Sequence, residues 1–572
     1  MKTNICKFLL IILLSNISVL VFPQKKYPKH YFRSPVNFPI YLSGTFGEIR
    51  ENHFHSGIDI KTQGVTGKKI YAVANGYVSR IKISANGYGK ALYITHPNGY
   101  VSVYGHLKKF NKTLTKHTLK QQYKNKTFEI DIDVPKNLLK VKKGDIIAYS
   151  GMTGGAFGPH LHFEIRDEKS QHPLNPLLFG FKVKDYIRPK IILMRLYPYG
   201  NNSFVNGKNS PETFSLRGWG PKYHLKNNDT ISVSGNIFFG IKTYDILNNA
   251  SNQNGVYSVK LFKDSVLCYS HRLKEFSFSE KRDVNTLIDY AEFIKSDVKI
   301  LRTYVSPNNK LSIYDEVKNN GIINFDDNKY HNLCFEIKDA NGNISILKFV
   351  VKSEKSNHKI KEKKIKGKLF YWDKNNFIKT DDLNLKVPAF ALYDTLDFIF
   401  KCSGSIVTDG YSKLYHIHNR YTPLHKKCIL SIKPKFVSDK LKSKLLIIKK
   451  DEKGEIDFAE GEWKNGFVNA KIKELGDYYI AIDTVPPVIK PLNNKKIVKQ
   501  KIIKLCVKDT LSDIKSYNGF LNDKWVLVEY DAKNDLMFYS FDRRVKSGKN
   551  VFKLEVKDNK DNAASYKVVF YK

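Results

Sequence analysis

Cysteine is scarce in this sequence, with six residues in 572. Five of them follow the first 24 residues at wide, irregular spacing, and no Cys-x-x-Cys pair occurs. An odd number at such spacing argues against a disulfide framework and against a structural zinc knot. We expect most of the five to be small buried apolar residues, with a bridge such as Cys402 to Cys428 as the alternative. The five are Cys268, Cys334, Cys402, Cys428 and Cys506.

Long apolar runs are missing after the first 24 residues, so no later segment is expected to cross a membrane. Residues 1–24 differ, because two lysines come first and short apolar runs follow. This pattern predicts a secretory signal peptide at 1–24, and hence export to the periplasm, the cell envelope or the medium. An uncleaved membrane anchor is the alternative, but Ser15, Asn16 and Ser18 break a run that is already short for a membrane span.

Acidic residues are few relative to basic ones, 55 against 96, which gives a net charge of +41. Such a charge can favour nucleic acid, anionic lipid or an acidic polymer. Lysine is abundant here together with asparagine, isoleucine, tyrosine and phenylalanine, which indicates an A+T-rich coding sequence rather than a dedicated patch. An exported protein also rarely meets nucleic acid. We therefore expect no nucleic-acid partner, and only a weak, salt-sensitive attraction to an anionic cell envelope.

Composition and length indicate a folded protein with several domains, and the runs described below predict that it is mostly β. Apolar residues make up 42% of the chain and aromatic residues 13%, which excludes wholesale disorder. The chain is several times longer than a domain of about 150 residues, and two linkers, at 352–368 and 483–489, help to divide it. The expected domains are 25–187, 188–355, 366–483 and 484–572.

Helical periodicity is hard to find in residues 25–187, where short β-like runs alternate with glycine turns. Turn signals such as Asn75-Gly76, Asn86-Gly87 and Asn98-Gly99 separate the runs, as antiparallel hairpins require. We therefore expect a compact antiparallel β domain. The runs are 69–74, 76–83, 91–95, 100–104, 145–149 and 161–165.

A lysine- and threonine-rich insert at about 108–140 interrupts this pattern. A short helix is expected within it, at 118–123. Inserts of this kind beside a site more often form a lid or a cleft wall than supply a catalytic group.

The remaining sequence holds a weak internal repeat. Residues 333–345 resemble 553–565, each an alternating strand that runs into an Asp/Asn turn and then another apolar strand. Likewise 240–247 and 506–513 both precede a turn and a further strand. Units of this size predict immunoglobulin-like sandwiches in the second and last domains, with a distinct β domain between them.

An alternating run near the end of the first domain carries a chemical signal. His160, His162 and Glu164 alternate there with apolar residues. On a strand, which rises about 3.3 Å per residue, both imidazoles lie on one face. One ring can then bind a metal while the other reaches a metal-bound water. Taken alone, such a pair is a weak signal.

A second stretch, from His55 to Asp59, offers an imidazole and a carboxylate that suit zinc. By itself this spacing is commonplace, and a surface Asp beside an unrelated His is the alternative. The two stretches together supply enough groups for catalytic zinc, which usually takes three protein ligands and leaves a fourth position for water. His106 ends a β run between them, and Gly57 and Gly158 are expected to permit tight approach.

Together these stretches resemble the lysostaphin-like (LytM-type) zinc endopeptidases that cut peptidoglycan peptides. The matching segments occur in the family's order, and the long insert at 108–140 is the departure from its pattern. The resemblance leaves the last two thirds of the chain unexplained. The matching segments are 44–50, 55–59, 74–78, 87–89, 104–107, 141–147, 151–154 and 158–164.

The resemblance implies a fold of the duplicated hybrid motif type and one zinc ion per chain. His55, Asp59 and His162 would be the zinc ligands, with water as the fourth. His106 and His160 would be catalytic residues that flank the open position, orient or deprotonate the water and stabilise the oxyanion. Their division of labour, and the bond that is cut, stay open.

The other histidines are not expected to bind the metal. His53 is close to His55, but the family motif selects His55. His416, His418 and His425 form a second cluster near Cys428, without a glycine framework around it. We expect no metal site there.

The expected function is that of an exported zinc metalloendopeptidase that hydrolyses peptide bonds in peptidoglycan crosslinks with a zinc-activated water. The C-terminal β domains would then position it on the anionic envelope or bind an envelope protein. One alternative is a non-catalytic cell-wall-binding regulator that retains the peptidase fold, although such relatives typically lose ligands. Another is a surface adhesin in which the first domain is incidental.

Overall fold

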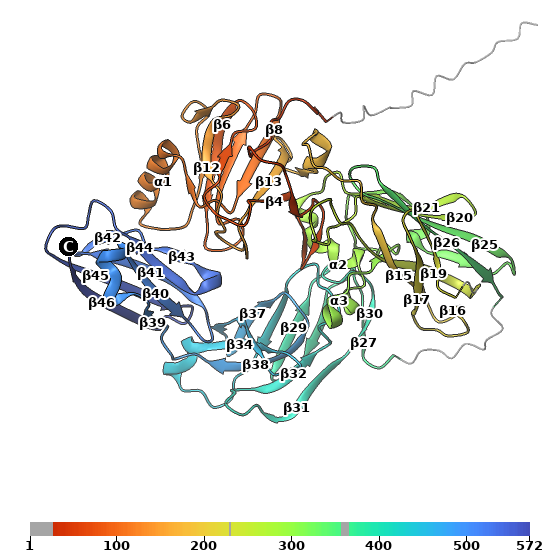
Figure 1. Cartoon of the computed structure of the whole chain (residues 1–572). Helices are drawn as coiled ribbons and strands as arrows, with labels where there is room; N and C mark the ends of the chain where they lie inside the picture. The colour runs from red at the N-terminus through yellow and green to blue at the C-terminus, as the bar shows by residue number, and fades with distance from the viewer. Residues whose placement is uncertain (1–26, 228–229, 356–364) are drawn as a thin grey trace, which may run out of the picture.

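The computed structural model describes residues 27–227, 230–355 and 365–572. The signal peptide predicted at 1–24 and much of the linker predicted at 352–368 lie outside these residues. The described chain is mostly β, as predicted, and four groups of sheets enclose separate hydrophobic cores. Among the described residues no helix is long and apolar enough to cross a membrane. The four groups are arranged around a ring (Figure 1).

The first group, here the N-terminal domain, is built on a nine-stranded sheet with the main order β1-β4-β13-β8-β7-β6-β10, while β11 pairs with β6 and β14 with β13. A three-stranded sheet, β5-β12-β9, and the hairpin β2-β3 complete it. The strands are β1 (Leu42–Gly44), β2 (Ile49–Arg50), β3 (His53–Phe54), β4 (Ile58–Lys61), β5 (Lys69–Tyr71), β6 (Gly76–Ile83), β7 (Lys90–Thr95), β8 (Tyr100–Gly105), β9 (Lys109–Phe110), β10 (Ile130–Asp133), β11 (Lys140–Val141), β12 (Ile146–Tyr149), β13 (His160–Asp167) and β14 (Pro173–Leu174).

Three neighbouring strands of the large sheet bring the candidate site together. β13 lies between β4 and β8, antiparallel to both. In this register His162 is opposite Asp59 on one side and Gly105 on the other. Alternate residues of β13 such as Leu161 and Phe163 are fully buried in the core. The alternation seen in the sequence therefore anchors one face of β13 and directs its histidines to the other.

The insert forms α1 (Lys112–Asn125) and β10, which extends the sheet beside β6. The helix is longer than the predicted 118–123, because Asn111 caps it by accepting a hydrogen bond from the backbone N–H of Leu114. Its Tyr123 packs against Trp525 and lies under the guanidinium of Arg544, both in the last group of strands. The insert is thus a contact surface for the C-terminal part of the chain.

The second group, here the second domain, links twelve strands in one curved network, closed where β26 pairs with β19 as well as with β18 and β25. Helices α2 (Val284–Leu287) and α3 (Tyr290–Ser296) lie in one of its loops. Its strands are β15 (Lys190–Pro198), β16 (Phe204–Val205), β17 (Glu212–Trp219), β18 (Lys222–Leu225), β19 (Ile231–Tyr244), β20 (Ser258–Lys263), β21 (Val266–Arg272), β22 (Leu301–Arg302), β23 (Tyr314–Val317), β24 (Ile323–Phe325), β25 (Tyr330–Lys338) and β26 (Ile344–Ser353).

The third domain has two five-stranded sheets, β28-β29-β33-β37-β36 and β31-β32-β38-β34-β35, and the pair β27-β30. Its strands are β27 (Lys368–Phe370), β28 (Asn376–Lys379), β29 (Leu383–Val387), β30 (Leu396–Phe398), β31 (Phe400–Ile406), β32 (Lys413–Ile417), β33 (Cys428–Ile432), β34 (Leu445–Lys450), β35 (Ile456–Glu460), β36 (Glu462–Lys464), β37 (Phe467–Ile472) and β38 (Gly476–Ile482). Cys428 is buried in its core and Cys402 is exposed. All five described cysteines are free, so the alternative of a bridge between these two is wrong.

The last domain has two four-stranded sheets, β39-β40-β44-β43 and β42-β41-β45-β46, and the short helix α4 (Ile497–Gln500). The immunoglobulin-like architecture of the second and last domains stays a prediction. The strands are β39 (Val488–Pro491), β40 (Ile502–Lys508), β41 (Ile514–Leu521), β42 (Lys524–Val526), β43 (Glu529–Asp531), β44 (Leu536–Ser540), β45 (Lys549–Asp558) and β46 (Ala563–Tyr571).

The last domain closes the ring by returning to the N-terminal domain (Figure 1). Lys90 forms an ion pair with Glu529, with Nζ and Oε2 2.6 Å apart. Lys533 donates through Nζ to the carbonyl oxygens of Met152 and Gly154, at 2.5 and 2.9 Å. The end of the chain therefore holds a loop that lies close to the candidate site.

Candidate metal centre

Three potential ligand atoms converge where Asp59 of β4 is paired with His162 of β13. His55 Nε2 lies 3.0 Å from Asp59 Oδ1 and 3.0 Å from His162 Nδ1, and the last two atoms are 2.9 Å apart. All three residues are buried. The structure therefore brings together the three residues that the sequence suggested as metal ligands.

The hydrogen bonds around the two imidazoles leave lone pairs at the centre. His55 donates through Nδ1 to the carbonyl oxygen of Thr45 at 2.8 Å. His162 donates through Nε2 to Glu164 Oε1 at 2.8 Å. The nitrogens that face each other are then unprotonated, and a carboxylate oxygen of Asp59 joins them. Three converging acceptors need a cation between them, and this set of two imidazoles and one carboxylate fits zinc.

Glu164 is fully buried and is held by several donors. Arg166 donates through Nε to its Oε2 and Ser56 donates through Oγ to its Oε1, both at 2.6 Å, and the Tyr88 hydroxyl donates to Oε1 as well. Burial alone would raise the pKa of Glu164, but Arg166 and His162 hold that pKa well below its usual value. A charged Glu164 therefore fixes the tautomer of His162.

Asp59 is oriented from its other oxygen. Arg50 donates through Nη2 to Asp59 Oδ2 at 2.8 Å, which leaves Oδ1 directed at the two imidazoles. This oxygen is therefore available to a cation.

His106 and His160 lie side by side next to the three ligand atoms. Their ring centroids are 4.8 Å apart, and His160 Nε2 lies 3.6 Å from Asp59 Oδ1. His106 donates through Nδ1 to the carbonyl oxygen of Thr153 at 2.8 Å, and His160 donates through Nδ1 to that of Gly158 at 2.9 Å. Each ring therefore keeps an unprotonated Nε2. Burial lowers the pKa of His106 to about 3 and also lowers that of His160, so both are neutral at pH 7.

Two glycines are required by close contacts at this centre. A Cβ on Gly57 would lie 2.3 Å from the carbonyl oxygen of Phe163, so the turn after His55 approaches β13 only with glycine there. A Cβ on Gly44 would lie 2.8 Å from Asp59 Oδ2. A Cβ on Gly158 would meet nothing within 4 Å, so the expectation that Gly158 permits a tight approach is wrong.

The remaining histidines have other contacts. His53 is exposed, and its Nδ1 donates to the carbonyl oxygen of Glu51. His416 bonds to Asp477, and His418 bonds to Thr422. Among the described residues, no group of three potential metal ligands includes any of these histidines.

Sequence reasoning missed several side chains that hold the ligands in place. Arg50 belongs to a segment that carried the family resemblance, and Tyr88 to another, but neither had a role assigned. Arg166 continues the alternation of β13 two residues beyond Glu164, and this spacing could have identified it. The Thr45 carbonyl could not have been found, because backbone direction at a turn has no residue signature.

A cavity of about 960 Å³ lies beside the metal centre and has walls from three domains. The N-terminal domain contributes His55, His106 and His162. The opposite wall comes from the second and third domains and is basic, with Lys281, Arg282, Lys427, Lys473 and His425. No residue of the 108–140 insert lines the cavity, so the expectation of a lid or cleft wall is wrong.

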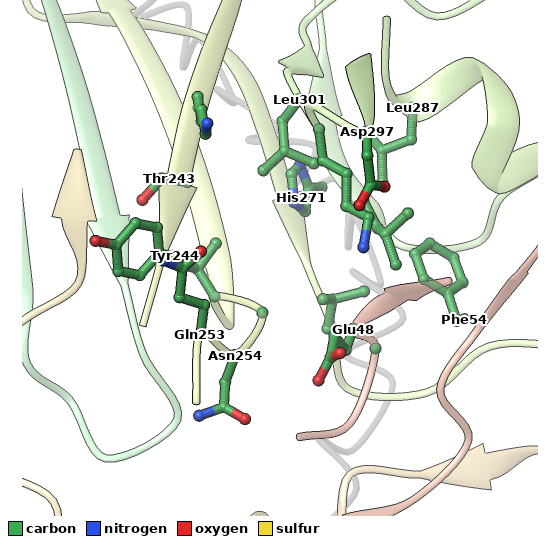
Figure 2. A pocket seen from close by; sticks show the side chains of 17 residues that line it. Glu48, Phe54, Thr243, Tyr244, Gln253, Asn254, His271, Leu287, Asp297 and Leu301 are labelled. Carbon is green, nitrogen blue, oxygen red and sulfur yellow. The ribbon is translucent and has the colours of Figure 1, made fainter. Parts of the chain in front are cut away.

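A second cavity, of about 240 Å³, lies where the N-terminal domain meets the second domain. Figure 2 shows Glu48 and Phe54 of the N-terminal domain across this cavity from Thr243 and Tyr244 of β19. Phe46 and Phe54 pack against Phe276 at the same junction, with ring centroids 5.0 and 5.2 Å apart. This contact fixes the wall of the larger cavity.

Comparisons with known proteins match the first part of the chain to a known family. Residues 53–123 and 131–176 match the model of Peptidase family M23. The chain contains a Peptidase family M23 domain. Residues 367–483 match the model of a Zu5-like domain. The candidate metal centre lies within the residues that span this match.

Curated relatives match over the M23 domain. The "DD-carboxypeptidase/endopeptidase Mpg" of Neisseria meningitidis serogroup B is 27% identical over 162 residues, which is 28% of this chain and 28% of that protein. An "Uncharacterized metalloprotease" of Haemophilus influenzae is 32% identical over 135 residues, 23% of this chain and 22% of that protein. The chain thus spans less than a third of the curated relatives it matches.

Two solved structures are also similar over this part. The catalytic domain of the prophage-encoded M23 protein EnpA from Enterococcus faecalis is 25% identical, with a TM-score of 0.19, and covers 26% of this chain and 95% of that one. The catalytic domain of lysostaphin from Staphylococcus simulans is 23% identical, with a TM-score of 0.18, and covers 24% of this chain and 88% of that one.

Replacing Glu164 is expected to weaken metal binding without removing a ligand. In Glu164→Gln the neutral amide no longer favours the Nε2 proton of His162 as strongly, so we expect zinc affinity to fall about tenfold. Competition with a chelating dye measures this. Glu168→Gln, an exposed residue just beyond β13, is the control and should bind as the wild type does. Equal affinities in both variants would contradict the role of Glu164.

Proposed function

We propose that this chain is an exported zinc metalloendopeptidase that hydrolyses peptide bonds in peptidoglycan crosslinks. The observation that carries the proposal is the convergence of three metal-ligand lone pairs, from His55, Asp59 and His162, beside the free Nε2 atoms of His106 and His160. The M23 match and the names of the curated relatives support a peptidase that acts on peptidoglycan.

The residues divide the chemistry between binding and proton transfer. His55, Asp59 and His162 would hold one zinc ion, which supplies a Lewis acid and lowers the pKa of a water. His106 and His160 are neutral and present Nε2 on the open side, so either can accept the proton of the attacking water. The imidazole that takes the proton becomes a donor, and can then stabilise the oxyanion or protonate the leaving amine.

The basic wall of the large cavity favours the binding of an acidic substrate. Lys281, Lys427 and Lys473 are exposed and face the metal centre from two other domains. Peptidoglycan peptides carry free carboxylates, and clustered ammonium groups raise the local concentration of such a substrate. The second and third domains would therefore contribute to substrate binding, and not only to placement on the anionic envelope or on an envelope protein.

Digestion of defined substrates tests the proposed function. The mature wild-type protein, loaded with zinc, is incubated with crosslinked and uncrosslinked peptidoglycan fragments, and the products are identified by mass spectrometry. We expect crosslinked fragments to be cut at a peptide bond in the presence of zinc and to stay intact with a chelator. If the zinc-loaded protein binds the fragments but leaves every peptide bond intact, the non-catalytic regulator replaces the enzyme.

A further inference from the structure

The repeat that the sequence revealed brings three acidic residues together at the junction of the first two domains. Asp245 follows β19, Asp339 follows β25, and Asp185 lies in the segment that leaves the N-terminal domain just before β15. One carboxylate oxygen of each lies within 4.8 Å of the others, and all three residues are buried. This acidic trio is separate from the metal centre and is not used by the proposed function.

The trio lacks a balancing positive charge. In the part of the chain that the structure describes, no lysine or arginine forms an ion pair with Asp185, Asp245 or Asp339. Asp245 is 3% exposed, and its Oδ1 has no hydrogen-bond partner. Burial and the neighbouring carboxylates raise the pKa of Asp185 to about 7 and that of Asp245 to about 8. Uncompensated buried carboxylates are costly, and a bound cation is one way to compensate them.

The surroundings of the trio are rigid and rich in oxygen atoms. Asp339 Oδ1 accepts hydrogen bonds from the backbone N–H groups of Asn341, Gly342 and Asn343, at 2.9, 2.7 and 2.9 Å. The side chains of Asn341 and Asn343 donate to the carbonyl oxygen of Asp185, at 3.5 and 3.3 Å. These contacts fix the carboxylate of Asp339 and the backbone of Asp185 before any ion binds.

A small cavity of about 10 Å³ lies beside the trio and is lined by Asp185, Asp245 and Asn341 together with Thr45 and Asn175 of the N-terminal domain. A space of that size admits one water-sized particle. Asn254 pairs with Asp245 through two backbone hydrogen bonds, so their side chains are neighbours, and its buried Oδ1 also has no partner.

We propose that Asp185, Asp245 and Asp339 form a binding site for one calcium ion. Carboxylate and amide oxygens without histidine or cysteine are the ligands of a hard cation. Contributions from three separate segments suit the flexible coordination of Ca²⁺ better than the strict octahedron of Mg²⁺. The ion would tie the interdomain segment to two strand ends of the second domain, and so fix the M23 domain against the wall of its cavity. This proposal does not depend on the proposed function.

The last domain contains a second acidic trio, which differs from the first in the positive charge near it. Asp483, Asp509 and Asp558 occupy the corresponding places before β39, after β40 and at the end of β45, again with ligand oxygens within 4.8 Å. Here Lys560 stands where Asn341 stands in the first trio. Its Nζ donates to the carbonyl oxygens of Leu445 and Gly461 at 2.6 Å, and its positive charge acts on Asp483 and Asp558 without a direct ion pair. Lys444 also donates through Nζ to Asn562 at 2.6 Å. Because the protein supplies positive charge at this second trio, we propose no ion there.

Calorimetric titration tests the calcium site. The full zinc-loaded chain is titrated with CaCl₂, and separately with MgCl₂, and thermal unfolding is followed in each salt. We expect one equivalent of Ca²⁺ per chain, tighter than Mg²⁺, and a rise in unfolding temperature with Ca²⁺ concentration. Asp245→Asn removes a charged ligand and should weaken Ca²⁺ binding at least ~10-fold. Asp509→Asn, the matched change in the second trio, should bind as the wild type does.

Two variants of the first trio provide further tests of the calcium site. Asp245→Asn removes an uncompensated charge, so without calcium it should unfold at the same temperature as the wild type or higher. Asp339→Asn provides a second, independent loss of affinity if Asp245→Asn fails to fold. Absence of Ca²⁺ binding in the wild type up to millimolar concentrations would overturn the proposal. So would tighter binding of Mg²⁺, or a loss of calcium in Asp509→Asn that Asp245→Asn does not share.

Discussion

His162→Ala is expected to abolish both zinc binding and peptide hydrolysis. His162 Nδ1 is one of the three converging ligand atoms, and its Nε2 connects the centre to Glu164. Alanine removes the ligand and leaves Glu164 and Arg166 without their central partner. With only two protein ligands left, zinc should no longer be retained after gel filtration, and the hydrolysis rate should fall at least ~10³-fold. Metal analysis and the peptide digest measure the two effects.

His53→Ala is the matched control for this result. His53 is a histidine of the same domain that also borders the large cavity, but its Nδ1 bonds to the backbone and its ring is not among the converging ligands. We expect this variant to retain one zinc per chain and most of its activity. Retention of zinc by His162→Ala, or loss of zinc in His53→Ala, would mean that the ligands have been assigned wrongly.

His106→Ala and His160→Ala are expected to separate metal binding from turnover. Neither side chain belongs to the converging set, and each is held by a backbone carbonyl through Nδ1. Zinc content should therefore stay near that of the wild type. Removing a general acid or base typically costs 10²- to 10⁴-fold in rate, so we expect kcat to fall by about that factor for at least one of the two.

The double variant shows how the two histidines work together. If both act on one water, the combined loss should be smaller than the product of the single losses, because residues that act as a unit are not additive. Loss of zinc in both single variants would instead place these residues among the ligands. Full activity in both would remove them from the chemistry.

The sequence predicted those parts of the site that depend on local spacing. The alternation of His160, His162 and Glu164 with buried residues defined a strand face, and β13 has that geometry. The choice of His55 over His53 depended on the family motif, and the structure brings only His55 to the convergence point. What joins the two segments, the register of β4 against β13, is a long-range pairing that no local pattern specifies.

The sequence could not predict how the domains surround the site. The basic residues Lys281 and Lys473 are far apart in the sequence and border one cavity only because the second and third domains pack together there. The role of the insert was likewise misjudged, because a helix next to a site can face either the cleft or a neighbouring domain. Tyr123 faces Trp525, so α1 serves the second purpose.

The acidic trios show the opposite case. The sequence pattern that contains them was recognised, but the clustering of its aspartates was not. The repeat that contains Asp339 and Asp558 was recognised as strand and turn only. Both aspartates face two others that lie far away in the sequence. Only the fold shows that the repeat carries a charge cluster as well as a turn.

Zinc titration of the metal-free protein tests the central claim most directly. The purified protein is stripped with a chelator, and release of peptides from a defined crosslinked fragment is measured as zinc is added back. The account predicts that activity is absent without zinc, rises in proportion to the zinc added and reaches its plateau at about one ion per chain. Peptide release that is independent of zinc, or a chain that takes up zinc and releases no peptide, would contradict it.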